Sequence, residues 1–179
     1  MQYTVNNFEL SIRMTLKNLM VLFCLCLSLI LNAQESLSEV LDEYNNGSIP
    51  YITVDELATS KTETVLLDAR EIKEYRTSHL ENAINVGYDE FNIQTVLKNI
   101  KDKTTRVVVY CSIGVRSEDI AEKLKEEGYT NVYNLYGGIF EWKNNDYIVY
   151  DHDNEPTENV HTYSKKWSKW LLKGNKIYD

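Results

Sequence analysis

Hydrophobic and polar positions alternate along the middle of the chain with two different periods, which predicts a series of short helices and strands. Apolar residues recur at helical spacing in Ser36–Asn45, Glu71–Thr77, Tyr88–Ile100, Glu118–Glu127 and Ile139–Asn144. Short apolar runs typical of strands occupy Tyr51–Thr53, Thr64–Asp68, Ala83–Val86, Arg106–Tyr110, Asn131–Leu135 and Tyr147–Tyr150. Strands that alternate with helices over about 110 residues indicate an α/β domain with a mainly parallel central sheet flanked by helices on both faces.

Local signals refine this pattern. Val107, Val108 and Val109 follow one another without a polar break. A run of this kind is buried on both faces, as in a central parallel strand. Thr53 and Glu56 stand three residues apart and form a capping box, which predicts a further helical turn there.

The N-terminus carries the pattern of an export signal. Leu19–Leu31 is a nearly unbroken apolar run of thirteen residues that follows Lys17. A membrane-spanning helix needs ~20 such residues, whereas a signal peptide needs fewer. Ala33 is the small residue that a signal peptidase requires. We therefore expect an export signal over residues 1–33, with a true start at Met1 or Met14, and an exported protein in the periplasm or outside the cell. A retained anchor or a buried core helix is the alternative.

The remaining chain divides into three parts. Residues 34–50 form a helix and linker, residues 51–150 form the α/β domain, and residues 151–179 form a C-terminal extension. Within the extension, Trp167, Trp170 and Leu171 lie at helical spacing among lysines in Ser164–Lys173. This pattern predicts a short closing helix whose tryptophans cover the domain. A membrane-surface or partner-docking helix is the alternative, and we do not expect membrane contact.

Composition restricts the possible partners. The 179 residues include 19 Lys and Arg against 27 Asp and Glu, a net charge of −8. Nucleic-acid binding normally needs a basic face, so we expect no nucleic-acid partner. Cleavage after Ala33 would remove Cys24 and Cys26 and leave Cys111 as the one thiol, which excludes an internal disulfide. His152 and His161 have no neighbouring ligand set in the sequence, so we expect no metal and no cofactor.

Cys111 stands where an α/β protein places its chemistry. It directly follows the central strand, and a short loop then leads into the next helix, at the carboxyl edge of the sheet where ligands bind. Backbone N–H groups of such a loop can surround an anion and lower the pKa of a thiol. Gly114 supplies backbone freedom, and Arg116 can hold an anionic substrate. These parts indicate covalent catalysis on an anionic sulfur or phosphorus compound. The alternative is a small buried Cys111 with a solvated Arg116.

Four motifs in this order resemble the single-domain rhodaneses, the thiosulfate sulfurtransferase-like family. The resemblance covers about Ile52 to Tyr150. Its motifs are Leu67–Glu71, Glu74-Tyr75 with Ser78–Val86, Val108–Cys111 with Gly114, Arg116 and Ser117, and Gly137–Ile139 with Trp142.

The resemblance implies that Cys111 takes a sulfane sulfur from a small anionic donor, becomes a persulfide and passes the sulfur to cyanide or a thiol. The loop that surrounds this persulfide would comprise Ser112, Ile113, Gly114, Val115 and Arg116. Asp68, Arg70 and Ser117 would support the loop, although Asp68 and Arg70 also fit a purely structural polar pair. His79 matches a fold-supporting position. Trp142 is expected to pack the last helix against the sheet.

The identity of the donor stays open at this point. Many thiosulfate-specific members carry a second cation in the loop, where this chain has the neutral Ser112 and Ile113. A persulfide or polysulfide donor therefore fits as well as thiosulfate. A non-catalytic module, or a carrier that hands sulfur to a thiol protein, is a second hypothesis. A Cys-dependent phosphatase is weaker, because four residues separate Cys111 from Arg116 whereas phosphatases have five.

Overall fold

The computed structural model describes residues 13, 17–21 and 36–178, which belong to two units, residues 1–36 and 37–179. In the first unit, residues 13 and 17–21 are helical. The expected cleavage position after Ala33, and the apolar run beyond Val21, lie outside the described residues. Within the part of the chain that is described, no helix is both long enough and apolar enough to cross a membrane.

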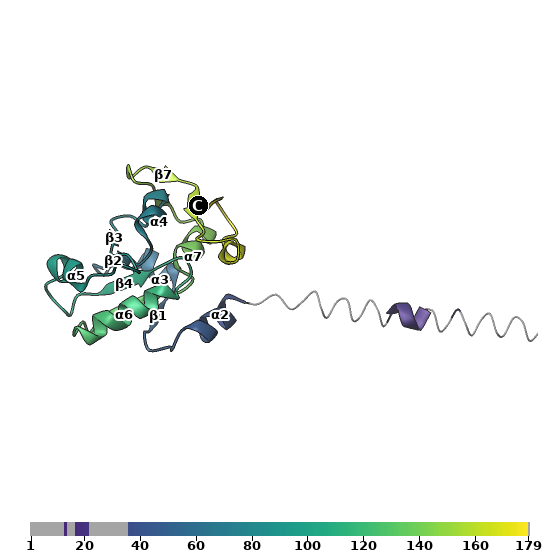
Figure 1. Ribbon diagram of the computed structural model, residues 1–179, viewed down its shortest axis with the longest axis horizontal. Coiled ribbons are helices and arrows are strands. Elements are labelled where there is room, and N and C mark those ends of the chain that lie inside the picture. Colours follow the sequence, from purple (N-terminus) through teal and green to yellow (C-terminus); the bar gives the residue numbers. More distant parts are fainter. Residues whose placement is uncertain (1–12, 14–16, 22–35, 179) are drawn as a thin grey trace, which may run out of the picture. The chain divides into compact units, whose positions relative to one another are not determined.

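The second unit is an α/β domain built on a parallel sheet (Figure 1). Its five strands have the order β1-β5-β4-β2-β3, and every neighbouring pair is parallel. The strands of this sheet are β1 (Tyr51–Ile52), β2 (Val65–Asp68), β3 (Ile84–Asn85), β4 (Val107–Tyr110) and β5 (Val132–Leu135). The α-helices are α2 (Leu37–Tyr44), α3 (Val54–Thr59), α4 (Ile72–Thr77), α5 (Ile93–Asn99), α6 (Arg116–Glu126) and α7 (Gly138–Asn144). The predicted fold class is confirmed.

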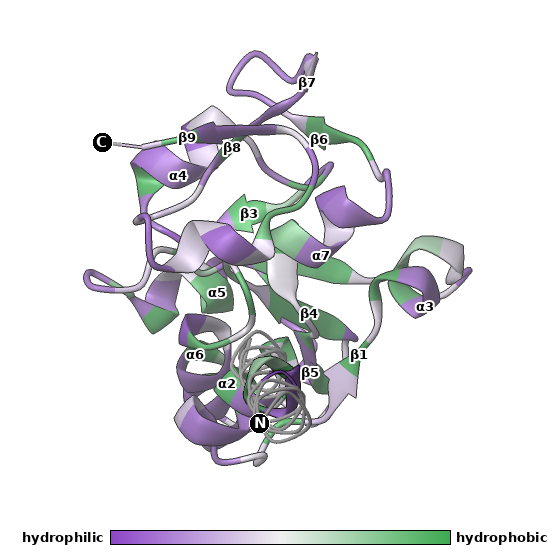
Figure 2. Cartoon of the chain, turned by 90° about the vertical axis from the view of Figure 1, so that its right-hand side faces the viewer, coloured by the Kyte–Doolittle hydropathy of each residue, from purple (hydrophilic) through white to green (hydrophobic). Residues whose placement is uncertain are grey.

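β4 lies at the centre of the sheet and is buried along its whole length. Because successive side chains of a strand point to opposite faces, Val107 and Val109 join one hydrophobic cluster while Val108 and Tyr110 join the other. The first cluster lies against α5 and α6, and the second against α3 and α7. Figure 2 shows β4 between these two helical layers. The predicted burial of the valine run on both faces is confirmed.

Capping residues fix where the helices begin. Thr53 Oγ1 accepts a hydrogen bond from the Glu56 amide at 3.2 Å, and Glu56 Oε2 accepts one from the Thr53 amide at 2.9 Å, so the predicted capping box is present. The helix expected over residues 88–100 begins only at Ile93, because the Asn92 side chain caps it. α6 begins two residues before the expected Glu118, at Arg116.

The helix predicted over Ser164–Lys173 is wrong. Only a single 3₁₀ turn forms there, η1 (Trp167–Trp170). Asn144 of α7 ends it, because its Nδ2 donates to the Trp170 carbonyl at 2.9 Å and its Oδ1 accepts from the Leu172 amide at 2.7 Å. These contacts to another element outweigh the weak helical preference of a short segment.

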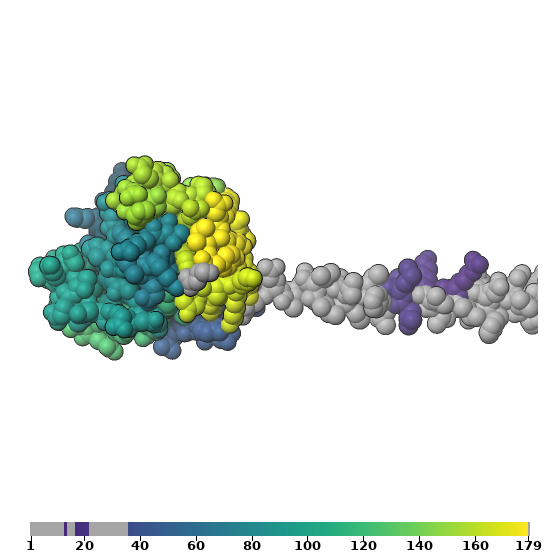
Figure 3. Space-filling model, turned by 45° about the horizontal axis from the view of Figure 1, so that its top comes forward, coloured from purple at the N-terminus to yellow at the C-terminus, as the bar shows by residue number. Residues whose placement is uncertain are grey.

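The rest of the extension is made of short strands that pack on the domain. β7 (Pro156–Thr157) pairs antiparallel with β6 (Val149–Tyr150), the last strand before the extension, and β8 (Asn159–His161) pairs parallel with β9 (Asn175–Ile177). Val160 and Leu171 are fully buried in the same hydrophobic cluster as α3 and α7. In Figure 3 the yellow extension lies directly against the segment that contains α4. The extension therefore completes one face of the domain.

Candidate active site

The loop after β4 holds the Cys111 sulfur among hydrogen-bond donors. Cys111 Sγ accepts a hydrogen bond from the Gly114 amide at 3.2 Å and from Ser117 Oγ at 3.5 Å. Gly114 has φ +112°, a conformation that L side chains rarely adopt, and this lets its amide turn toward the sulfur. The cysteine is 1% exposed and directly follows β4, and the loop of residues 112–115 joins it to the first turn of α6. Of the loop amides predicted to surround the cysteine, the structure places that of Gly114 within hydrogen-bond distance of the sulfur.

The start of α7 holds the same loop from behind. The first amides of a helix have no acceptor within that helix. In α7 the Ile139 amide donates to the Cys111 carbonyl at 3.0 Å, and the Phe140 amide donates to the Ser112 carbonyl at 3.1 Å. A Cβ at Gly138 would lie 2.3 Å from the Cys111 carbonyl oxygen, so only glycine allows the helix to approach this closely. The Gly137-Gly138 motif is thereby explained as a support of the cysteine loop.

Two asparagines that sequence reasoning missed also support the loop. Asn134 Nδ2 and Asn45 Nδ2 both donate to the Gly114 carbonyl, at 2.7 and 2.9 Å. Asn134 Oδ1 accepts from Ser117 Oγ at 2.7 Å, which orients the hydroxyl that faces the sulfur. Ser117 therefore has the supporting position expected of it. Asn45 is 69 residues and Asn134 is 20 residues from Gly114 along the chain, and no local sequence signal marks either asparagine.

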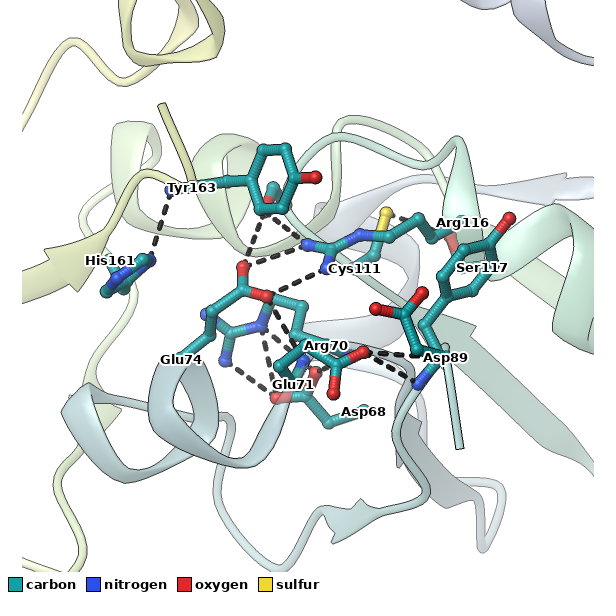
Figure 4. Close-up of polar contacts among 12 residues, drawn as sticks. Asp68, Arg70, Glu71, Glu74, Asp89, Cys111, Arg116, Ser117, His161 and Tyr163 are labelled. Atoms are coloured by element: carbon teal, nitrogen blue, oxygen red, sulfur yellow. Dashed lines mark hydrogen bonds and ion pairs between the residues drawn. The ribbon is translucent and has the colours of Figure 1, made fainter. Parts of the chain in front are cut away.

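Arg116 forms a bidentate ion pair with Glu74 (Figure 4). The Glu74 side chain is fully buried. Its two terminal nitrogens lie 2.7 and 2.8 Å from the two Glu74 oxygens, and Arg116 Nη2 also donates to Ser112 Oγ at 3.2 Å. Burial acts to lower the pKa of the Arg116 guanidinium. The hydrogen bonds to Glu74 and the electrostatic interaction with Cys111 outweigh this effect, so the pKa lies above its usual value. Burial would raise the pKa of Glu74, yet Arg116 holds it below the usual range. The positive charge of Arg116 is therefore balanced within the protein, and the alternative of a solvated Arg116 is wrong.

Asp68 and Arg70 form a second buried pair beneath the site. Both side chains are fully buried, and Arg70 Nη2 donates to Asp68 Oδ2 at 2.6 Å and to the Ser78 carbonyl at 2.6 Å. Burial lowers the pKa of Arg70, but the Asp68 carboxylate more than offsets this and raises it. These contacts join the end of β2 to the end of α4, and the pair also touches Tyr110 at the end of β4, whose hydroxyl donates a hydrogen bond to Asp68 and whose ring lies beneath the Arg70 guanidinium. This placement fits a structural pair.

His79 has the structural surroundings expected of it, whereas the described ring and hydrogen-bond contacts of Trp142 are with the segment that follows α7 and not with the sheet. His79 is 2% exposed, its ring stacks on Tyr75 at 4.1 Å, and its backbone pairs with Tyr150. Trp142 packs on Tyr147 at 4.6 Å and donates from its indole nitrogen to the Ile148 carbonyl. Both side chains join α4 and α7 to neighbouring segments.

A pocket of about 300 Å³ adjoins the cysteine. Cys111 and the loop residues Ser112, Ile113, Val115 and Arg116 line one part of it. Aromatic and acidic side chains line the rest, namely Tyr44, Tyr88, Tyr163, Trp167, Glu71 and Asp89. None of these six was a predicted site residue, because they come from separate segments that only the fold brings together.

The fold and site define an α/β domain with a cysteine in an amide-lined loop between the central strand and a helix. The family model of the rhodanese-like domain matches residues 53–145, just over half of the chain. The chain belongs to the rhodanese-like domain family, as the four motifs indicated.

Curated relatives match less than half of the chain. A tRNA uridine(34) hydroxylase from Erwinia tasmaniensis is 36% identical over 85 residues, which are 45% of this chain and 24% of the relative. A protein of the same name from Onion yellows phytoplasma is 37% identical over 90 residues, 48% of this chain and 29% of the relative. The chain thus spans about a quarter of the length of these relatives.

Solved structures show the same fold. A thiosulfate sulfurtransferase from Pseudomonas aeruginosa superposes with a TM-score of 0.54 at 24% identity, covering 69% of this chain and 23% of that one. A protein from Bacillus halodurans superposes with a TM-score of 0.51 at 20% identity, covering 65% of this chain and 87% of that one.

Proposed function

We propose that the protein is a sulfurtransferase in which Cys111 carries a sulfane sulfur as a persulfide. The observation that carries this proposal is the Cys111 sulfur itself, which accepts hydrogen bonds from Gly114 and Ser117 inside a six-residue loop. Donors in this arrangement stabilise negative charge on sulfur.

The reaction has two steps. The Cys111 thiolate attacks the outer sulfur of the donor, the bond between the two donor sulfurs breaks, and the rest of the donor leaves with the electron pair. With thiosulfate the leaving group is sulfite, and with an organic persulfide it is a thiolate. In the second step cyanide or a thiolate attacks the outer sulfur of the Cys111 persulfide, the bond between the two persulfide sulfurs breaks, and the Cys111 thiolate leaves. We assign no general base, because a thiolate that attacks sulfur has no proton to be removed in the same step.

The loop residues have separate parts in this proposal. The amides of Ser112–Arg116 surround the added sulfur, and Arg116 stabilises its charge from the side while Glu74 holds the guanidinium in place. Ser117 donates to the thiolate. Asp68 and Arg70 keep β2 and α4 together beneath the loop.

The experiment that tests the proposal is intact-mass measurement of the full chain before and after thiosulfate, and separately after inorganic polysulfide. Cys111→Ala is the control, because it leaves Cys24 and Cys26 in place. A gain of one sulfur on the parent alone, discharged by cyanide as thiocyanate, supports the transferase. Loading without turnover by small acceptors supports the carrier that delivers sulfur to a thiol protein. If thiosulfate, inorganic polysulfide and an organic persulfide all fail to load Cys111, the sulfurtransferase is excluded and the non-catalytic module takes its place.

A phosphatase is the weaker enzymatic alternative. The four-residue spacing between Cys111 and Arg116 gives a small loop, and the Arg116 charge is already paired with Glu74. Release of p-nitrophenol from p-nitrophenyl phosphate by the parent, and not by Cys111→Ala, would favour the phosphatase.

We further propose that the protein is exported and that its partners are small sulfur compounds or a thiol protein, without a metal or cofactor. The apolar run Leu19–Leu31 followed by Ala33 supports export. N-terminal sequencing of the protein after cell fractionation tests this, with Gln34 as the expected first residue. A chain that keeps Met1 or Met14 in the cytoplasmic fraction would contradict it.

A further inference from the structure

Three of the four aromatic residues that line the pocket beside Cys111 come from outside the family segment, and we call these three the aromatic wall. Tyr44 belongs to α2, and Tyr163 and Trp167 belong to the C-terminal extension, so all three lie beyond residues 53–145. The rings of Tyr44 and Trp167 meet edge to face at 5.7 Å. Two segments that are far apart in the sequence thus build one apolar surface next to the reactive sulfur.

Tyr163 is held at this wall by a strained turn. Its φ is +60°, which is unfavourable for a bulky residue. The turn is closed by a hydrogen bond from the Ser164 amide to the Thr162 carbonyl at 2.6 Å, and His161 Nδ1 accepts from the Tyr163 amide at 3.1 Å. Strain of this kind persists only where the surrounding structure enforces it. The result is that the Tyr163 ring lies 4.9 Å from the Arg116 guanidinium carbon (Figure 4).

Arg116 is consequently enclosed by protein groups on two sides. Glu74 occupies both of its terminal nitrogens, and Tyr163 covers the face of the guanidinium. Its side chain is 16% exposed. A second anion therefore meets a guanidinium that is already paired with a carboxylate.

The unpaired charges of the pocket wall are negative. Glu71 Oε1 accepts from the amides of Tyr88 and Asp89 at 3.2 and 3.1 Å, which holds this carboxylate in the wall beside that of Asp89. Among the lining residues that the structure describes, Arg116 is the one cation. Lys166 lies near this region, 5.1 Å from the centre of the Trp167 ring, but does not line the pocket.

We infer that the donor to the Cys111 thiolate is an organic persulfide, and the acceptor from the Cys111 persulfide an organic thiol, each with an apolar or cationic substituent, and that dianionic thiosulfate is a poor substrate. The substituent packs on Tyr44, Tyr163 and Trp167, and a cationic group on it faces Glu71 and Asp89. In the donor direction the Cys111 thiolate attacks the outer sulfur of the organic persulfide, and the organic thiolate leaves. This inference names the substrate class of the proposed sulfurtransferase and rests on that function.

The first test measures how the substituent of a thiol reagent changes the rate at which Cys111 is modified. The full chain with Cys24→Ser and Cys26→Ser has Cys111 as its one thiol. It is treated with methanethiosulfonates that carry a benzyl, a trimethylammonioethyl or a sulfonatoethyl group. Each thiolate attack forms a mixed disulfide and releases methanesulfinate, and intact mass gives the rate. Rates are divided by those of free 2-mercaptoethanol, which removes intrinsic differences between the reagents.

We expect the benzyl and cationic reagents to react at least about tenfold faster than the anionic one. Trp167→Leu should remove most of the benzyl preference, whereas Tyr178→Leu, an exposed tyrosine away from the pocket, should not. Glu71→Gln should narrow the ratio of cationic to anionic rates, and the exposed Glu81→Gln should leave it unchanged. Equal normalised rates for the three reagents, or a faster anionic reagent, would overturn the inference.

The second test separates this inference from the proposed function. Cys111 is loaded with sulfur, and its discharge is followed with cysteamine, 2-mercaptoethanol and 2-mercaptoethanesulfonate. Preference for the cationic and neutral thiols supports the inference. Loading followed by equal discharge leaves the sulfurtransferase intact and contradicts the pocket selectivity. A failure of every donor to load Cys111, with the methanethiosulfonate preference retained, excludes the sulfurtransferase while the charge and aromatic selectivity of the pocket stands.

Discussion

Glu74 determines how Arg116 is presented to the cysteine loop. Its carboxylate is fully buried, and both of its oxygens are used by the guanidinium. A buried charge without its partner is strongly destabilising, because it has lost water and gained nothing in return. The same residue thus supports both the fold and the geometry of the proposed persulfide site.

We expect Glu74→Gln to lower the free energy of unfolding by about 3 kcal/mol, since Arg116 then lacks a counter-charge. Urea unfolding followed by circular dichroism measures this. The exposed Glu81→Gln is the matched control and should change stability by less than about 0.5 kcal/mol. Equal stability of the two variants would show that the ion pair contributes nothing to the fold.

The lowered pKa of Glu74 also predicts a pH dependence. Burial opposes ionisation of this carboxyl, but Arg116 more than offsets it, so the folded pKa lies below the unfolded value of about 4.3. A group of this kind stabilises the fold above its unfolded pKa, and the stabilisation is lost as the pH falls through the folded pKa. The difference in the free energy of unfolding between the parent and Glu74→Gln should therefore have its full value at pH 7 and should decrease below about pH 4. A gap that widens on acidification would contradict this assignment.

At the scale of elements, Gly138 sets the distance between α7 and the cysteine loop. A methyl group there would overlap the Cys111 carbonyl, whereas one at Gly47 would meet nothing within 4 Å. Both residues have positive φ, +53° and +65°. The two positions therefore separate backbone strain from steric overlap.

We expect Gly47→Ala to cost about 1 kcal/mol of stability from its backbone conformation alone. Gly138→Ala should cost at least about 2 kcal/mol and also slow sulfur loading of Cys111, because the loop must move away from α7. Thermal unfolding and the intact-mass assay measure the two effects. Similar losses in both variants would show that the close approach of α7 is unimportant.

The elements differ in how far the sequence determines them. The Val107–Val109 run allowed a correct prediction of β4, because three consecutive branched apolar residues fit only a strand buried on both faces. The helix predicted over Ser164–Lys173 failed, because Asn144 ends the turn through contacts that local pattern cannot reveal. The Cys111 loop was predicted from its position directly after β4, at the carboxyl edge of the sheet. Its partner Glu74 is 42 residues away from Arg116, and only the fold shows the pairing.

At the scale of the whole molecule, the chain is acidic and shares one segment with its curated relatives. Those relatives are named for an action on tRNA, but about three quarters of their length lies outside the shared segment. With 27 acidic against 19 basic residues, the chain lacks the excess of cations that nucleic-acid binding draws on.

We therefore expect the full chain not to retard tRNA in a native gel at low salt, where electrostatic binding is strongest. A positively charged protein of similar mass serves as the control for retardation. A shift by this chain that weakens as salt is added would establish a nucleic-acid partner and overturn the expectation.

The position of the aromatic wall has a consequence for how such proteins diversify. Residues 53–145 contain the cysteine loop and its supports from α4 and α7, while Tyr44, Tyr163 and Trp167 come from the flanking segments. Mutations in the flanking segments can therefore change which sulfur compound binds in the pocket without changing Cys111 or Arg116. Two homologues with nearly identical central segments can thus serve different metabolic roles, and their flanks are where that divergence should be sought.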